Sequence, residues 1–188
     1  PLTVNPQTGM AHGELNWKRG KYTAWTPEHP VLIPFTIYAV DGDVLTALYT
    51  TKTAVRTVSV SREKGFELNG VTRKIKGVCL HHDLGPLGVA ENRTALIRRI
   101  RRMKDMGADA IRTSHNMPSE LLMQLCDSLG MMVMAESFDM WIYPKCRNGY
   151  ARFFKEWADK DIENLVRHHR NHPCIVMWSI GNEIPEQW

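Results

Sequence analysis

The sequence has 188 residues, of which 43% are hydrophobic, so it predicts a folded globular protein and excludes the disordered and fibrous classes. Its 24 basic and 20 acidic residues give a net charge of +4, which does not by itself indicate a nucleic-acid partner. No apolar run approaches the roughly 18–20 residues of a membrane span, so we expect no membrane partner.

The four cysteines favour reduced thiols over a disulfide scaffold. They show no C-x-x-C spacing and are sparse for a chain of this length. They are Cys79, Cys126, Cys146 and Cys174. No signal peptide is recognisable near Pro1, but a fragment would lack its parent's leader, so the compartment stays open between periplasm and cytoplasm.

Residues 1–65 form a block rich in Thr and Val with short alternating runs. The runs Val31–Val40 and Thr53–Val60 are typical of strands, and Pro34 places the first of them at a sheet edge. The turn signal Asp41-Gly42-Asp43 is expected to join these two runs. The block therefore predicts an antiparallel β domain, or part of one.

From Phe66 onward, predicted strands alternate with predicted helices. The strands are Lys74–Leu80, Ala108–Ser114, Met131–Ala135 and Cys174–Trp178, and the helices are Glu91–Met106, Pro118–Leu129 and Tyr150–Arg170. Strict alternation requires parallel strands with right-handed crossovers. No Gly-rich phosphate loop follows any strand, which favours a β/α barrel over a nucleotide-binding sheet. Since a complete barrel has eight such units, residues 66–188 predict its first half.

The densest basic run, Arg98–Lys104, lies in the first of these helices. The apolar residues of that helix recur at helical spacing, which places most of the cations on the opposite, solvated face. The apolar positions are Ile97, Ile100, Met103 and Met106. The run is therefore better explained by the helix than by a nucleic-acid partner.

Each predicted parallel strand is followed by polar or ionisable residues. They are His81, His82 and Asp83 after the first strand, Arg112 and His115 after the second, Glu136 and Asp139 after the third, and Asn182 and Glu183 after the fourth. In β/α barrels the carboxyl ends of the strands share one face, where catalytic groups gather. Singly, each has an ordinary alternative: Arg112 pairs internally with Glu136, or Asn182 and Glu183 open a polar loop. Together they predict one pocket.

A metal site at these strand ends is the first competing interpretation. His81, His82, Asp83 and His115 are all acceptable ligands. Adjacent His81 and His82 point to opposite sides of an extended strand, however, so they do not easily bind one ion together. We therefore expect no metal and no cofactor. On the last helix, the sequence predicts a surface role for His168 and a packing role for His169.

Several ordered motifs carry a family resemblance that extends from about Trp25 to Glu183. They are Phe66-Glu-Leu-Asn-Gly70, Gly77-Val-Cys-Leu-His-His-Asp83, Met103-Lys-Asp-Met-Gly-Ala-Asp-Ala-Ile-Arg-Thr-Ser-His115, Leu125-Cys-Asp-Ser-Leu-Gly130, Arg170-Asn-His-Pro173 and Trp178-Ser-Ile-Gly-Asn-Glu183. The sequence resembles glycoside hydrolase family 2, the family of β-galactosidases and β-glucuronidases. The resemblance implies an immunoglobulin-like β-sandwich domain, here partial over residues 1–65, followed by the first half of a TIM (β/α)8 barrel over residues 66–188.

The resemblance also implies roles for the residues at the strand ends. Glu183 matches the general acid/base, Asn182 and His115 match sugar-contacting residues, and Asp83 and Asp139 are candidates for the sugar subsite. The family's nucleophile comes from the seventh barrel strand, which this sequence does not contain. Two segments depart from the common pattern, Asn116-Met-Pro118 and Glu136–Trp141, so the motifs leave galactose specificity open.

The resemblance implies hydrolysis of terminal β-glycosides with retention, so we expect a carbohydrate as the partner. Retaining enzymes use two carboxyl groups about 5–5.5 Å apart, and the acid must hold its proton near neutral pH, which burial favours. Glu136 or Asp139 could approach Glu183 from the neighbouring strand, but no family motif makes either the nucleophile. We expect negligible turnover from this chain alone, and self-association through open sheet edges. The alternatives are a non-catalytic carbohydrate-binding or interaction module and a metal-dependent hydrolase.

Overall fold

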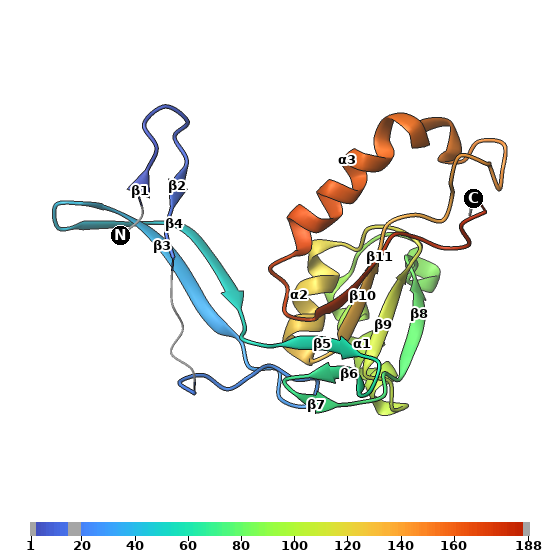
Figure 1. Ribbon diagram of the computed structural model, residues 1–188, viewed down its shortest axis with the longest axis horizontal. Coiled ribbons are helices and arrows are strands. Elements are labelled where there is room, and N and C mark those ends of the chain that lie inside the picture. The colour runs from blue at the N-terminus through green and yellow to red at the C-terminus, as the bar shows by residue number, and fades with distance from the viewer. Residues whose placement is uncertain (1–2, 15–19, 186–188) are drawn as a thin grey trace.

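A parallel sheet of four strands lies at the centre of the computed structural model, which describes residues 3–14 and 20–185 (Figure 1). Its strands are β8 (Gly77–His81), β9 (Ala110–Ser114), β10 (Met132–Glu136) and β11 (Ile175–Ser179), in the spatial order β11-β10-β9-β8. Between them come the 3₁₀ turn η1 (Gly85–Leu87) and the helices α1 (Arg93–Asp105), α2 (Glu120–Leu129) and α3 (Ala151–His169). Each strand lies beside its predecessor, so the predicted alternation of parallel strands and helices is confirmed.

Helix α1 begins at an asparagine cap and covers the sheet with one apolar face. The Asn92 side chain accepts a hydrogen bond from the Ala95 amide at 3.0 Å, which satisfies one of the free amides of the first turn. The buried side chains of α1 are Leu96, Ile100 and Met103. Met106, predicted on this face, is 67% exposed because it caps the helix beyond its last turn.

Helix α2 has a serine at its start and a glycine at its end. Ser119 caps it by accepting a hydrogen bond from the Leu122 amide at 3.2 Å. Pro118 therefore precedes the cap, and its predicted place in the first turn is wrong. Gly130 ends the helix in the left-handed region, at φ 73°, where a Cβ atom would lie 2.2 Å from the Pro27 carbonyl oxygen. Only glycine fits there.

The core lies between the sheet and its helices. Ile100 of α1, Leu125 of α2, Leu165 of α3 and Val133 of β10 are each at most 2% exposed. The run Cys174–Trp178, predicted as a buried strand, is buried only at its start. Trp178 is 44% exposed because β11 is an edge strand that β10 covers on one side only.

The N-terminal strands form smaller antiparallel units. They are β1 (Thr3–Val4) with β2 (Ala11–His12), β3 (Ile33–Asp41) with β4 (Val44–Thr53), and β5 (Val58–Ser61) with β6 (Gly65–Leu68) and β7 (Val71–Thr72). The predicted turn is confirmed, since Gly42 and Asp43 join β3 to β4. The turn does not join the two predicted runs, because β3 pairs with β4. The predicted strand Thr53–Val60 is confirmed only in part: Thr53 ends β4, residues 54–57 form no strand, and Val58–Val60 lie in β5.

The long hairpin of β3 and β4 extends away from the parallel sheet (Figure 1). Among the described residues it pairs with no further strand, so the immunoglobulin-like sandwich stays a prediction. The predicted domain boundary at residue 66 falls inside β6, and the division into residues 1–65 and 66–188 also stays a prediction. Residues 1–2, 15–19 and 186–188 of those two ranges lie outside the described residues. None of the described helices is both long enough and apolar enough to span a membrane.

A partly buried lysine ties the end of α2 to the N-terminal segment. Arg98, Arg101 and Arg102 of α1 are exposed, as predicted for a solvated face. Lys104 is only half-exposed, and its Nζ donates to three carbonyl oxygens: those of Pro27 at 2.8 Å, Leu129 at 2.6 Å and Gly130 at 2.9 Å. Two of these carbonyls end α2 and lack helical partners, so the ammonium group supplies what the helix cannot.

Replacing Lys104 with methionine keeps most of the side chain's apolar length but removes the donor from all three carbonyls. We expect the free energy of unfolding to fall by about 1–3 kcal/mol, since those carbonyls then lack a partner. Lys160→Met, on the exposed face of α3, is the matched control and should change stability by less than about 0.5 kcal/mol. Urea denaturation measures both, and an unchanged midpoint for Lys104→Met would contradict this role.

Candidate active site

The carboxylate of Glu136 organises the ends of three parallel strands. Glu136 is the last residue of β10 and is fully buried. One of its oxygens accepts hydrogen bonds from Arg112 Nε at 2.6 Å and Ser179 Oγ at 2.7 Å. The other oxygen lies 2.6 Å from His115 Nδ1. The internal pairing of Arg112 with Glu136, weighed from the sequence as an alternative, is therefore confirmed.

Strand register explains why these side chains meet. Glu136 lies opposite Ser179 where β10 pairs with β11, and Met134 lies opposite Arg112 where β10 pairs with β9. Parallel strands that end at one level bring their terminal side chains together without any long loop. Ser179 was not singled out from the sequence. Its only signal is that a hydroxyl ends an otherwise apolar strand.

The hydrogen bonds continue from Arg112 to the predicted acid/base. Arg112 Nη2 donates to Asn182 Oδ1 at 3.0 Å, and Asn182 Nδ2 donates to Asp139 Oδ1 at 2.8 Å. Lys145 Nζ then bridges two carboxylates, Asp139 at 2.7 Å and Glu183 at 2.8 Å. We call the hydrogen-bonded side chains of Glu136, Arg112, Ser179, His115, Asn182, Asp139, Lys145 and Glu183 the strand-end network. It unites four of the five predicted site residues.

Lys145 is a second member of the network, after Ser179, for which the sequence predicts no role. It lies in the loop between β10 and α3, where a single lysine in a polar stretch carries no signal. Its hydrogen bonds to Asp139 and Glu183 raise its own pKa. Burial favours the neutral form of Asp139, but its hydrogen bonds with Lys145 and Asn182 prevail and hold the pKa of Asp139 below its ordinary value.

The position of Glu183 is set by the backbone hydrogen bonds of the preceding residue, and not by burial of its side chain. Its side chain is 73% exposed and its φ is 47°, in the left-handed region. Both backbone polar groups of the preceding Asn182 are hydrogen-bonded. Its amide donates to the Phe138 carbonyl at 2.8 Å, and its carbonyl accepts from Trp141 Nε1 at 2.7 Å. The expectation that the acid Glu183 is buried is therefore wrong in this chain. Among the described residues only four barrel strands are present, and they surround Glu183 on one side only.

Gly181 allows this approach of the chain to the β10–α3 loop. A Cβ atom there would lie 2.6 Å from the Phe138 carbonyl oxygen and 2.6 Å from the Trp141 ring. Because nothing larger than a hydrogen fits, glycine at this position is a packing requirement. It sets the path that carries Asn182 and Glu183 over the strand ends.

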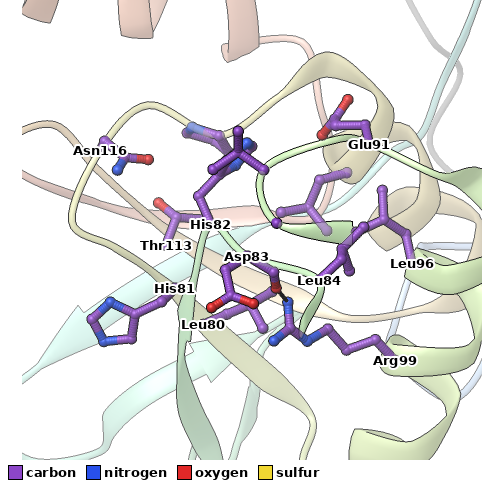
Figure 2. Close-up of a pocket in the computed structure, with 14 residues that line it drawn as sticks. Leu80, His81, His82, Asp83, Leu84, Glu91, Leu96, Arg99, Thr113 and Asn116 are labelled. Carbon is purple, nitrogen blue, oxygen red and sulfur yellow. Dashed lines mark hydrogen bonds between the residues drawn. The ribbon is translucent and has the colours of Figure 1, made fainter. Parts of the chain in front are cut away.

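Asp83 is the predicted site residue that the structure does not bring into the network. Its carboxylate accepts from the Gly85 amide, and its carbonyl accepts from Arg99 (Figure 2). It lines a pocket of only about 30 Å³, room for roughly one water molecule. His81 and His82 point to different sides, as expected (Figure 2). The His81 ring packs edge-on against the His115 ring at 5.2 Å between centroids.

A larger pocket lies beside His115 and Asp139. It has a volume of about 370 Å³, within the roughly 300–1,000 Å³ of small-molecule sites. Ser137, Tyr150 and Asp161 also line it. The hydroxyl of Tyr150 hydrogen-bonds Asp161, and burial together with that bond raises the pKa of Tyr150. Polar groups therefore converge on a pocket wide enough for a sugar next to the strand-end network.

Comparisons with known proteins show which family the chain resembles. A family model described as "Glycosyl hydrolases family 2, TIM barrel domain" matches residues 58–187. A β-galactosidase of Bacteroides ovatus is 45% identical over 164 residues, which cover 87% of this chain and 19% of the relative. A β-glucuronidase of Felis catus is 33% identical over 85% of this chain and 25% of its own length. The chain thus spans about a fifth to a quarter of these relatives.

Solved structures share the fold. A glycosyl hydrolase family 2 member from Bacteroides cellulosilyticus has a TM-score of 0.83 and 39% identity, over 87% of this chain and 21% of that one. A β-glycosidase from Bacteroides vulgatus has a TM-score of 0.85 and 38% identity, over 89% of this chain and 22% of that one. The predicted half of a TIM barrel is thereby confirmed.

The strand-end network makes a prediction about stability and pH. Burial favours the neutral form of Glu136, but the hydrogen bonds from Arg112, Ser179 and His115 outweigh it and lower the pKa of Glu136. A carboxyl group whose pKa is lower in the folded state contributes stability above its unfolded value of about 4.3, and loses it as pH falls through the folded pKa.

We therefore expect Glu136→Gln to lower the free energy of unfolding at pH 7 by about 2–3 kcal/mol. This is below the roughly 3–5 kcal/mol of a fully buried pair because the Arg112 side chain is 30% exposed. The difference from the wild type should shrink as pH falls below about 4. Glu163→Gln, which breaks an exposed pair on α3, is the control. Denaturant titrations across pH that show a constant difference would contradict the network's ionic character.

Proposed function

The chain belongs to family 2 of the glycosyl hydrolases, and on that premise we propose that it carries the acid/base part of a retaining glycosidase that hydrolyses terminal β-glycosides. The printed names of its relatives differ in the sugar, since some are β-galactosidases and others β-glucuronidases. The substrate class proposed is therefore the terminal β-glycoside, with the sugar undetermined. The whole protein's activity is part of the proposal, because this chain spans about a fifth of the Bacteroides ovatus relative.

One observation carries the assignment of residues: a continuous series of hydrogen bonds runs from buried Glu136 to Glu183 beside the 370 Å³ pocket. In the proposal Glu183 is the general acid/base, which protonates the leaving oxygen and then activates water. Asn182 and His115 contact sugar hydroxyls. Asp139 hydrogen-bonds both Asn182 and Lys145 and so orients these two side chains next to Glu183.

Glu136 is proposed to position these groups and not to act as the nucleophile. Both of its oxygens already accept hydrogen bonds, and the carboxylate is fully buried beneath Arg112 and Ser179. A nucleophile needs a free oxygen in line with the anomeric carbon. The second carboxylate of the retaining mechanism would then come from a later barrel strand, as the family resemblance implies, about 5–5.5 Å from Glu183.

Lys145 sets a condition on the first chemical step. Its ammonium group donates to the Glu183 carboxylate, an arrangement suited to the ionised form that acts as a base in the second step. The first step needs a proton on Glu183, so this contact must break when substrate and nucleophile are in place. The exposed position of both side chains leaves room for that movement.

The rival functions have less support. In a metal-dependent hydrolase, His81, His82, Asp83 and His115 would converge on one ion. Instead His115 hydrogen-bonds Glu136, and Asp83 faces Gly85. A non-catalytic carbohydrate-binding module would use the same sugar contacts without turnover, so a kinetic experiment separates it from the proposed enzyme.

The acid/base role predicts a dependence on the leaving group. In the protein at its natural length, Glu183→Gln should lower kcat/KM roughly 10²–10⁴-fold on β-glycosides with poor leaving groups. Dinitrophenyl glycosides, which leave without protonation, should be far less affected in the glycosylation step. Azide should restore turnover and yield a β-glycosyl azide.

The matched control is Glu163→Gln, an equivalent change at an exposed position of α3. It should leave every kinetic parameter unchanged. Equal losses for good and poor leaving groups, or an active Glu183→Gln enzyme, would sink the assignment. Sugar binding without any turnover in the unaltered protein would favour the binding module instead.

The chain of 188 residues by itself is expected to associate and to turn over no glycoside. The face of the sheet that the helices do not cover leaves a concavity of about 200 Å³, and Cys79, Arg112, Met134 and Met177 form the row of side chains that lines it. Among the described residues, β8 and β11 each pair with one strand only, so both are open edges of the sheet. Light scattering after size-exclusion chromatography should show dimers or larger species. A monodisperse, stable monomer would count against the expected self-association.

A further inference from the structure

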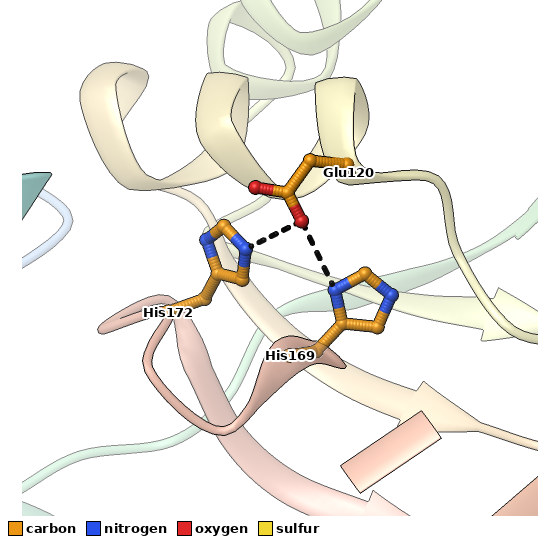
Figure 3. A group of neighbouring side chains, drawn as sticks. All are labelled: Glu120, His169 and His172. Atoms are coloured by element: carbon orange, nitrogen blue, oxygen red, sulfur yellow. Dashed lines mark hydrogen bonds and ion pairs between the residues drawn. The ribbon is translucent and has the colours of Figure 1, made fainter. Parts of the chain in front are cut away.

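Three side chains meet on a flank of α2, outside the strand-end network (Figure 3). Glu120 is the first residue of α2, His169 is the last residue of α3, and His172 lies in the turn before β11. Glu120 Oε2 is 3.2 Å from His172 Nε2 and 3.7 Å from His169 Nδ1. All the potential ligand atoms lie within 4.8 Å of one another.

Each imidazole is oriented by its other ring nitrogen. His169 Nε2 lies 3.0 Å from the Pro118 carbonyl oxygen, which can only accept, so Nε2 carries the proton and Nδ1 presents a lone pair. His172 Nδ1 lies 2.6 Å from Asp127, whose carboxylate is buried, which leaves Nε2 to face Glu120. Histidines that bind metals are held in this way, by a carboxylate or a carbonyl behind them.

His169 Nδ1 is the observation that asks for a ligand. His169 is 1% exposed, and among the described residues its Nδ1 has no hydrogen-bond partner. The nearest polar atom in the cluster is Glu120 Oε2, another acceptor. A proton on His172 Nε2 would satisfy Glu120, yet it would leave the lone pair of His169 buried and unfilled, which is costly. A cation placed among the three atoms satisfies all of them.

We propose that Glu120, His169 and His172 bind a divalent transition-metal ion of the zinc class. Zinc–nitrogen and zinc–oxygen bonds of about 2.0–2.2 Å put tetrahedral ligand atoms roughly 3.3–3.5 Å apart. The distances from Glu120 to the two histidines, 3.2 and 3.7 Å, are close to that spacing. Two imidazoles and a carboxylate suit zinc, cobalt or nickel, and they disfavour magnesium and calcium, which prefer oxygen.

The site has an open side and a mechanical consequence. Glu120, Asp127 and His172 line a groove of about 310 Å³, from which a water molecule reaches the fourth coordination position. The three ligands come from α2, α3 and the turn before β11, so the ion cross-links the two helices to the segment that leads into β11. Asp127 also accepts from the Cys174 amide at 2.9 Å, which ties the site to β11. The role assigned is structural and does not rest on the proposed glycosidase activity.

The test uses the protein at its natural length, stripped of metal with a chelator, dialysed, and then reloaded with zinc. After removal of the excess we expect one zinc ion per chain by elemental analysis. Adding zinc to the stripped protein should raise its Tm by several degrees, and magnesium or calcium should not. Cobalt should give the intense visible bands of a four-coordinate site. X-ray absorption at the zinc edge should show two imidazoles with oxygen and no sulfur.

Glu120→Gln is the deciding variant, since this side chain is 57% exposed and its loss should not unfold the protein. We expect it to weaken zinc binding at least roughly 100-fold, more than the loss of a supporting group costs. Glu163→Gln, equally exposed on α3, should bind zinc as the wild type does. Absence of zinc-dependent stabilisation in the wild type would overturn the proposal. So would equal binding by Glu120→Gln, or sulfur in the absorption spectrum, which would assign the metal to cysteines elsewhere.

Discussion

The buried carboxylate of Glu136 is the constraint on which the strand-end network depends. A charge without solvent needs several partners, and Glu136 finds them on the two neighbouring strands: Arg112 on β9, His115 just after β9, and Ser179 on β11. Because Arg112 is fixed by its bond to Glu136, its Nη2 reaches Asn182 and sets the position of the segment that carries Glu183. The exposed acid/base thus takes its place from a residue that is itself hidden from substrate.

Fold and site were predictable from the sequence to different extents. Apolar residues at three- and four-residue spacing in α2 and α3, together with the apolar strands between them, predict the half-barrel. This is possible because such periodicity shows which face of a helix or strand is buried. Lys104 and Lys145 were not predictable. Each makes its contacts with residues distant in sequence, and a lone lysine looks the same whether it is solvated or paired. Trp25 is similar: its Nε1 donates to the Asp127 carbonyl at 2.8 Å, a contact across 102 positions that no local pattern indicates.

The histidines also show what the sequence can and cannot predict. The sequence places potential ligands at His81, His82 and His115, where strand geometry keeps two of them apart, and it predicts a packing role for His169. His169 is indeed buried, but its unfilled Nδ1 faces Glu120, 49 positions earlier in the chain. Burial follows from helical spacing, whereas the direction of a lone pair depends on tertiary packing. A metal there would stiffen the approach to β11, at the end of the strand opposite Glu183.

The most direct test of the account is a crystal structure of the natural-length protein with a tight-binding analogue of the glycosyl oxocarbenium ion. We expect the Glu183 carboxyl to lie within hydrogen-bond distance of the atom that replaces the glycosidic oxygen. Asn182 and His115 should contact the sugar hydroxyls, and Glu136 should remain bound to Arg112 without touching the ligand. A sugar ring seated over Asp83 and Arg99, or Glu136 in line with the anomeric carbon, would contradict it.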